Sequence, residues 1–359
     1  MESPAESRVA VAVRDLPPGY FALVMATGII SLGLHLEGVD VLSTVLFAIA
    51  ATGYVVLVAL TVWRGIRYPR HVVDDFSTAH VAFSFFTFVA GTNVLGSRIA
   101  AEHGPVALPL TLLGVSFAAW LVLGYVIPGL VIGRHQGADI LAGLNGTWFI
   151  WSVASQSVAV LSASLEPWAP VGISDALSVV AVLSWGIGLI LYGVIGCAVV
   201  IRLLTRGIPA AELGPPYWVT MGAGAITVLA GSRIVEMTDT AIVSVVRAPV
   251  AAAAVVFWAF ATWLIPALAG IGLWRHLIKR VPLRYEASMW SMVFPLGMYA
   301  VAGIYLGDAD DLPIIGWIGG RFLWVAFAAW TIVLVWMLVS LVAAARAPRE
   351  TSAAGVDER

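Results

Sequence analysis

Charged residues are scarce in this sequence, at 11% of 359 residues, whereas a soluble domain contains roughly 25%. Apolar residues make up 60% of the chain, and the mean hydropathy is +0.96. A soluble chain could not bury that much apolar surface, because a single hydrophobic core stops growing at roughly 250–300 residues. The scarcity of charge therefore predicts an integral membrane protein whose main partner is the lipid bilayer.

Cysteine and the usual metal-ligand patterns are also missing. Cys197 is the only cysteine and lies in an apolar run, which excludes a disulfide framework and a cysteine-based metal site. The sequence has no His-Glu-x-x-His pattern, and glycine pairs such as Gly186/Gly188 lie inside apolar stretches rather than after a strand. The formal charge of −2 gives no basic excess for nucleic acid. We therefore predict no metal, no cofactor, no nucleic-acid partner and no enzymatic activity.

Ten apolar stretches are long enough to cross a bilayer, which takes about 20 residues of helix. They lie near residues 18–36, 41–63, 78–97, 106–132, 143–162, 176–201, 216–235, 249–273, 288–306 and 318–343. We predict one all-α membrane domain over residues 17–345, an N-terminal tail at 1–16 and a disordered C-terminal tail at 346–359. Both tails are predicted to be cytoplasmic.

The distribution of basic residues supports that orientation. An even number of spans places both termini on one side of the membrane. All of the 19 basic residues fall on that side except four, which are Arg98, Arg233, Arg247 and Arg321. Because lysine and arginine are enriched in cytoplasmic loops, the sequence predicts a multi-pass protein of the plasma membrane with its termini inside the cell.

Odd-numbered and even-numbered spans differ in composition. The even spans are uniformly apolar, whereas the odd spans are rich in glycine, serine, threonine and aromatic residues. Two odd spans end in the same tetrapeptide, at Gly96–Ile99 and Gly231–Ile234. Small and hydroxyl residues suit close helix packing or a water-filled lumen. We predict five helical hairpins, with the odd helices forming an inner ring around a central pore; ordinary membrane composition is the alternative. Predicted pore-lining residues include Thr27, Ser155 and Gly224.

The middles of the predicted spans lack Asp, Glu, Lys and Arg. Such residues, where present, mark proton relays and voltage sensors. Their absence from these segments argues against proton coupling through buried carboxylates. It favours passage of a solute through the ring.

Two segments resemble one family of membrane proteins. Pro17–Phe21, followed by Met25–Gly28, resembles the first helix of the tellurite-resistance/C4-dicarboxylate transporter family, which includes slow anion channels, malate permeases and sulfite exporters. Trp290–Gly297 resembles the ninth helix of that family. The resemblance implies a homotrimer with one anion pore in each protomer. It also implies that Phe294 closes the pore, and that Gly28 is the small first-helix residue that leaves room beside it.

The position of Phe294 is consistent with a gate on separate grounds. If the ninth span begins near Tyr285, a rise of ~1.5 Å per residue places Phe294 about 13 Å into the membrane. That depth is near the middle of a hydrocarbon core of ~30 Å. Pro295 removes a backbone donor and kinks the helix. The alternative is a packed phenylalanine beside a common membrane proline.

The sequence favours a passive channel or uniporter for small inorganic or carboxylate anions. The alternative is a coupled transporter or efflux pump for C4-dicarboxylate, sulfite or tellurite-like oxyanions, which would need a titratable or cation-binding centre. Arg98 and Arg233, at matching positions of the repeated tetrapeptide, are predicted to form an outer anion-attracting mouth. Each could instead extend to the lipid headgroups or pair with a neighbouring acid, Glu102 or Glu236.

Overall fold

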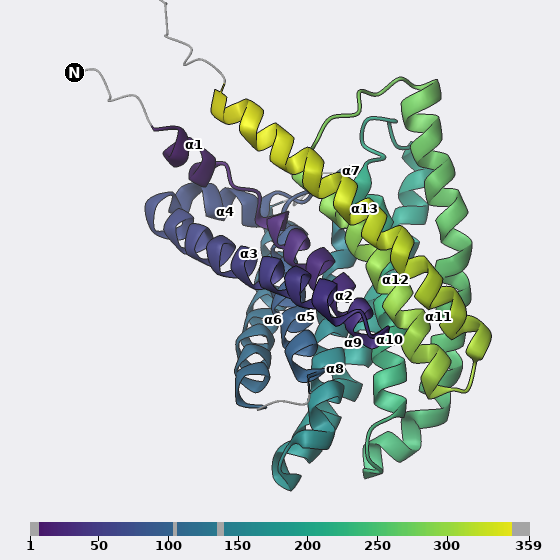
Figure 1. Cartoon of the computed structure of the whole chain (residues 1–359). Helices are drawn as coiled ribbons and strands as arrows, with labels where there is room; N and C mark the ends of the chain where they lie inside the picture. Colours follow the sequence, from purple (N-terminus) through teal and green to yellow (C-terminus); the bar gives the residue numbers. More distant parts are fainter. Residues whose placement is uncertain (1–6, 103–105, 135–139, 347–359) are drawn as a thin grey trace, which may run out of the picture.

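Residues 7–102, 106–134 and 140–346 are described by a computed structural model (Figure 1), and within these ranges the chain forms helices and no strand. The helices that correspond to the ten predicted spans are α2 (Ala22–Leu36), α3 (Asp40–Arg67), α5 (Phe86–Ala100), α6 (Ala107–Arg134), α8 (Phe149–Leu165), α9 (Val171–Arg206), α10 (Val219–Val235), α11 (Ala241–Leu273), α12 (Trp290–Ala309) and α13 (Pro313–Arg346). The predicted all-α membrane fold is therefore confirmed.

The third span departs from a simple membrane-crossing helix. The other nine, taken with their leading turns, are each long and apolar enough to cross a bilayer within the described ranges. Residues Ala82–Ala100 meet that criterion only together with α4 (Pro69–Ser77), from which they are bent by 115°. By itself this segment is not apolar enough, because Asn93 and Arg98 of α5 lower its mean hydropathy. α4 was not among the predicted elements; it combines charged and apolar residues in a pattern typical of an interfacial helix.

Two classes of helix alternate along the chain, as their compositions predicted. In the spans that contain α2, α8, α10 and α12, between 78% and 89% of the most apolar stretch is buried. In α3, α6, α9, α11 and α13 the buried share is only 17% to 28%. Long helices that expose their apolar side chains need lipid around them, whereas the shorter buried helices must pack against each other.

The buried helices form a closed ring. Each contacts the next in the order α2, α5, α8, α10 and α12, and α12 contacts α2. Each outer helix packs on the inner helix that precedes it in the chain; Figure 1 shows this for α13, which runs along α12. The five hairpins and the inner ring of odd-numbered spans are thus present. The first and last hairpins close the ring through the α12–α2 contact.

Every helix of this ring begins with a 3-10 turn. The turns are η1 (Pro18–Phe21), η2 (Ala82–Phe85), η3 (Gly146–Trp148), η5 (Pro215–Trp218) and η7 (Ala287–Met289). They contact one another in the same cyclic order as the helices, η7 being next to η1. Proline at the start of η1 and η5 favours such a turn, because its backbone nitrogen has no hydrogen to donate. All five inner helices therefore point the same way, with their N-termini at one end of the ring.

Helix boundaries differ from the predicted spans mainly in the outer helices. α9 extends five residues beyond the predicted 176–201 at each end, and α11 begins at Ala241 rather than near 249. Hydropathy marks only the lipid-embedded part of a helix, whereas backbone hydrogen bonds continue into the aqueous layer. Smaller elements complete the described chain. They are α1 (Arg8–Arg14), α7 (Ile140–Gly143), η4 (Glu166–Trp168) and the π-turn η6 (Trp274–Ile278).

Part of the predicted N-terminal tail is helical. α1 packs on α3, and Arg64 Nε donates a hydrogen bond to the carbonyl oxygen of Arg14 at 2.8 Å. Nη2 of Arg64 pairs with Oδ2 of Asp75 in α4 at 2.7 Å. One buried arginine thus ties α1, α3 and α4 together. The predicted C-terminal tail beyond Arg346 lies outside the described residues.

Candidate functional site: the axis of the inner ring

A small cavity lies on the axis of the ring. Its volume is about 10 Å³, which is near the minimum that holds one water molecule. All five inner helices contribute to its lining, which consists of Ile29, Leu32, Asn93, Val94, Ser97, Ser157, Val160, Ile226, Leu229 and Met298. The axis is therefore closed at this level, mostly by apolar side chains.

The polar part of the lining comes from α5 and α8. Asn93 Nδ2 donates to Ser157 Oγ at 2.9 Å, and the side-chain oxygen of Asn93 accepts a hydrogen bond from Ser116 of the outer helix α6. Ser97 Oγ donates to the backbone oxygen of Asn93 at 2.9 Å. An uncharged amide and two hydroxyls give the axis polar contacts without a fixed charge.

Phe294 is one helical turn from this cavity. It precedes Met298 by four residues on α12, so both lie on the same face of the helix, and its side chain is 1% exposed. Because each inner α-helix follows directly on a 3-10 turn, the five helices can be aligned by their first residues. Phe294 is the fifth residue of α12, so the equivalent position in the other helices is also the fifth residue. At that position the other helices have Ala26, Ala90, Val153 and Ala223, all fully buried. One phenylalanine among four small residues matches an arrangement in which a single ring fills the axis.

The depth predicted for Phe294 needs correction. The ninth span begins at Ala287 rather than near Tyr285 and ends at Ala309. Its midpoint is Met298, and Phe294 lies one turn nearer the end where the inner helices begin. Pro295 is inside α12, as predicted, and faces α10: a Cβ added to Gly222 would lie 2.8 Å from Pro295 Cγ. The proline therefore packs between helices.

Gly28 lies where α2 meets α5. A Cβ added to Gly28 would lie 2.8 Å from Val94 Cγ1, which is closer than real side-chain contacts allow. Val94 lines the axial cavity. Gly28 therefore lies behind Val94, one of the residues that line the axial cavity.

Three other predicted lining residues are directed to the outer helices. Thr27 Oγ1 accepts a hydrogen bond from Trp330 Nε1 of α13 at 2.9 Å, and Ser155 Oγ accepts one from Trp120 Nε1 of α6 at 2.9 Å. A Cβ on Gly224 would approach Tyr192, Phe257 and Ala261 of α9 and α11. The structure does not bring these three residues to the axial cavity.

Arg98 is buried between α2, α3 and α5, with 1% of its surface exposed. Ser31 and Ser43 form a reciprocal pair, in which each hydroxyl donates to the other's backbone oxygen at 2.7 Å. Both hydroxyl oxygens accept from Arg98, at 3.1 Å for Ser31 and 3.0 Å for Ser43. Arg98 also pairs with Glu102 at 2.9 Å. This side chain joins three helices inside the protein rather than facing an open vestibule.

We expect Arg98→Gln to lower the free energy of unfolding by roughly 1–3 kcal/mol, because buried hydroxyl oxygens and part of the Glu102 pairing lose their donor. Thermal unfolding of the purified protein in detergent measures the effect. Arg233→Gln is the matched control from the same tetrapeptide position, and it should shift the unfolding temperature much less. Equal shifts for the two variants would contradict the assignment.

Arg233 has different surroundings at the matching position of α10. It pairs with Glu236, its Nε donates to Ser164 of α8 at 3.4 Å, and its guanidinium lies 5.1 Å from the ring centre of Tyr305 on α12. A fifth of its side chain is exposed. Arg233 therefore lies across the far ends of three adjacent inner helices.

The opposite end of the ring contains the helix N-termini. The backbone N–H groups of an N-terminal turn carry partial positive charge and favour anions. Aromatic residues close the α2–α12 seam at this end: Tyr20 and Tyr285 are joined through their hydroxyls at 3.1 Å, and Trp290 Nε1 donates to Tyr285 at 3.2 Å. Five parallel helices thus direct a positive potential toward one mouth of the axis.

None of the residues that line the axial cavity was among the site residues predicted from the sequence. Met298 could have been found from Phe294, because residues four apart share a helix face. Asn93 could have been found as an amide inside the predicted span 78–97. The apolar lining residues give no signal that distinguishes them from ordinary core residues. Within the described residues, no group of three histidine, cysteine or acidic side chains is arranged to hold a metal ion.

Comparison with known proteins gives one family and several relatives. The SLAC1 family model, described as voltage-dependent anion channel, matches residues 15–338. An uncharacterized membrane protein of Mycobacterium tuberculosis is 54% identical over 166 residues, covering 46% of this chain and 84% of the relative. Two uncharacterized transporters of Methanocaldococcus jannaschii are 23% and 24% identical, over 90% and 92% of this chain and 94% of each relative.

Proposed function

We propose that this chain, which belongs to the voltage-dependent anion channel family, is a passive channel or uniporter for small inorganic or carboxylate anions that Phe294 gates. The family makes it an anion transporter or channel of the membrane. The passive mechanism, the gate and the class of anion are our inference. The observation that supports them best is the axis itself, which all five inner helices line with uncharged residues.

The chemistry of the axis suits weak and fast passage of an anion. Apolar constrictions exclude water and close a pore, and they open when a side chain moves aside. The Asn93 amide and the serine hydroxyls offer weak hydrogen bonds that a passing anion can exchange. The five N-termini attract anions to one mouth. A coupled carrier would instead need a titratable or cation-binding group in the path.

Flux measurements in liposomes test this proposal. The purified protein is reconstituted, and chloride, nitrate and malate currents are recorded with and without a proton gradient. We expect currents that follow the electrochemical gradient of the anion alone. Uptake against that gradient, driven by protons or sodium, would overturn the passive mechanism and favour a coupled pump for dicarboxylate, sulfite or tellurite-like oxyanions.

Assembly and location belong to the same proposal. We infer a homotrimer of independently conducting protomers in the plasma membrane, with both termini in the cytoplasm. The apolar surfaces of α3, α6, α9, α11 and α13 provide area for lipid and for subunit contacts. Light scattering of the purified protein tests for a trimer, and labelling of single cysteines placed at each end tests the orientation.

Arg233 is the residue that we propose for the outer mouth, and the carboxylate of Glu236, with which it pairs, offsets its positive charge. Burial raises the pKa of Glu236 above its usual value, the pairing with Arg233 opposes this shift, and Asp308 adds to it. Above that pKa the Glu236 carboxylate offsets the charge of Arg233; below it, the neutral Glu236 no longer does. Protonation therefore begins at a higher pH than for an exposed glutamate.

We expect anion flux at low ionic strength to rise severalfold as the pH falls from about 7.5 to about 5, a range above the titration of most exposed carboxylates. In Glu236→Gln the flux should be high at both pH values, and in Arg233→Gln it should be low at both. At about 0.15 M salt, where the Debye length is about 8 Å, all differences should shrink. A pH response that persists in Glu236→Gln would assign it to another group.

A further inference from the structure

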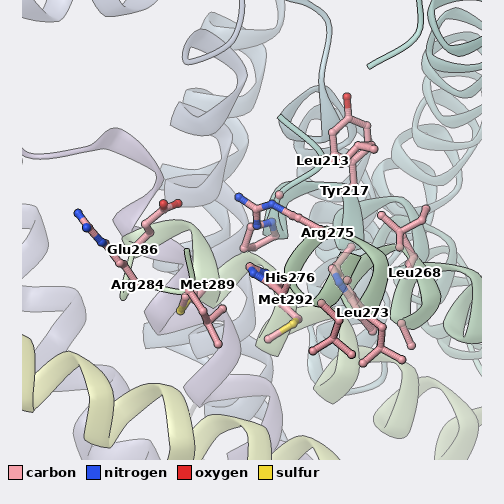
Figure 2. A pocket seen from close by; sticks show the side chains of 18 of the residues that line it. Leu213, Tyr217, Leu268, Leu273, Arg275, His276, Arg284, Glu286, Met289 and Met292 are labelled. Atoms are coloured by element: carbon pink, nitrogen blue, oxygen red, sulfur yellow. The ribbon is translucent and has the colours of Figure 1, made fainter. Parts of the chain in front are cut away.

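A second and much larger cavity lies outside the ring, at the end where the inner helices begin. Its volume is about 490 Å³, which is within the range of small-molecule sites. Three segments enclose it: residues 213–218 with η5, residues 268–277 at the end of α11, and residues 282–292 that lead into α12. Figure 2 shows it from close by. We name it the α11 cavity.

The two ends of the α11 cavity differ in chemistry. Figure 2 shows Arg284 and Glu286 at one end, Leu268 and Leu273 at the other, and Arg275 between them with its guanidinium directed toward Glu286. The segment from 275 to 284 contains five basic residues and no acid; they are Arg275, His276, Lys279, Arg280 and Arg284. The charged end is therefore net positive despite Glu286. An amphipathic cavity of this kind fits a ligand with an anionic head and an apolar tail.

The charged end is preorganised around Arg275. Its Nε donates to the backbone oxygen of Ala210 at 3.1 Å and its Nη2 to that of Ala211 at 3.3 Å. These bonds fix the guanidinium, and no acceptor among the described residues takes its Nη1. Nor does Arg284 form an ion pair or hydrogen bond within that part of the chain. The π-turn η6 contains Arg275 and His276, and such local widening of a helix is frequent at functional sites.

The apolar end opens toward the lipid. Leu273, Leu277 and Leu283 line the cavity and are 61%, 71% and 60% exposed. They continue the apolar surface of α11, which faces away from the ring over most of its length. An acyl chain could therefore enter from the bilayer without crossing a polar barrier. A free inorganic anion would leave this leucine surface without a partner.

We propose that the α11 cavity binds an anionic phospholipid from the adjoining leaflet. Its phosphate contacts Arg275 and Arg284, and an acyl chain lies along the leucines at the end of α11. Charge complementarity selects an anionic headgroup, since basic pockets at the membrane edge recognise such lipids. The bound lipid would contact η5 and η7, which are at the end of the ring where the inner helices begin, and Met292, which is two residues from Phe294.

Two glycines of α11 offer a matched pair of variants. A side chain added at Gly272 or at Gly270 would meet nothing within 4 Å, so both positions accept a larger residue. Only Gly272 lines the cavity. Gly272→Phe therefore fills the apolar end, and Gly270→Phe adds the same bulk elsewhere on the helix. Arg284→Gln removes charge at the cavity, and Arg346→Gln at the end of α13 removes the same charge outside it.

The test is native mass spectrometry of the full chain, purified in detergent and titrated with phosphatidylglycerol or phosphatidylcholine. We expect phosphatidylglycerol to bind at least about tenfold more tightly than phosphatidylcholine, a difference of about 1.4 kcal/mol. Gly272→Phe and Arg284→Gln should each remove most of that preference, and the two controls should keep it. Elution from a sizing column confirms that the variants are folded.

Three results would overturn the proposal. One is equal retention of the two lipids by the unchanged chain. Another is loss of binding in Gly270→Phe or Arg346→Gln to the same degree as in the cavity variants. The third is full competition by inorganic phosphate together with normal binding in Gly272→Phe, which would show a site for a free anion without a lipid tail. None of these measurements depends on anion flux.

Discussion

Anion conductance should rise about tenfold or more when Phe294 is replaced by alanine, because each ~1.4 kcal/mol removed from a barrier multiplies the rate about tenfold. The ring of Phe294 is 1% exposed and shares a helix face with Met298, which lines a cavity of only about 10 Å³. The four equivalent positions have alanine or valine. Removing the only large side chain of that layer leaves a wettable opening where an apolar plug excludes water.

Phe149→Ala is the control for this result. Phe149 is also fully buried on an inner helix, but its ring lies 5.4 Å from that of Tyr192 on the outer helix α9. Both substitutions remove the same atoms and leave a cavity, which costs roughly 3–5 kcal/mol in a packed core. Only Phe294→Ala should open the axis. Currents from liposomes with equal amounts of each folded variant decide the matter, and an unchanged current in Phe294→Ala would remove Phe294 from the gate.

The fold was predictable because it depends on composition over long segments. Lipid-facing and ring-forming helices need different residues, so the composition of Val41–Trp63 differs visibly from that of the glycine-rich segment 216–235. The 115° bend before α5 was not predictable, since it depends on how Pro69–Ser77 lies against its neighbours. Nor does hydropathy show where the 3-10 turns begin, so the span that contains Phe294 starts two residues later than predicted, and its predicted depth is about 3 Å too great at a rise of ~1.5 Å per residue.

The lining of the axis was less predictable, because it depends on the rotation of each helix about its own axis. Thr27 and Ser155 are small hydroxyl residues on inner helices, which is what a lumen requires. They are also suitable partners for an indole N–H, and Trp330 and Trp120 of the outer helices donate to them. Composition cannot distinguish these two uses. The decisive residues, the two tryptophans, are far away in the sequence.

The repeated Gly-Ser-Arg-Ile tetrapeptide also shows that local sequence does not predict the surroundings of a side chain. Arg98 and Arg233 occupy one position of one motif, at the same end of two parallel helices. Arg98 has Ser31 and Ser43 as partners in the first hairpin, so it is buried. Arg233 has Tyr305 and Glu236, so it stays near the surface. The two arginines therefore have the same local sequence but different electrostatic surroundings, because most of their partners come from other helices.

Gly28→Asp should reduce anion flux by about a hundredfold. A Cβ added at Gly28 would lie 2.8 Å from Cγ1 of Val94, which lines the axial cavity, so a side chain added there displaces Val94 or enters the cavity. A carboxylate at ~6 Å from a permeating anion repels it by roughly 3 kcal/mol at an effective dielectric constant of about 20. That energy corresponds to a factor of about a hundred in rate. Flux is measured in liposomes at neutral to alkaline pH.

Steric and electrostatic contributions to that loss are separable with Gly28→Asn. Asparagine has nearly the same volume as aspartate and meets the same Val94 methyl group, but it carries no charge. If Gly28 lies beside the anion path, Gly28→Asn keeps a substantial part of the flux and Gly28→Asp does not, although both fold. Equal losses in the two variants would mean that only the close α2–α5 packing matters at this position.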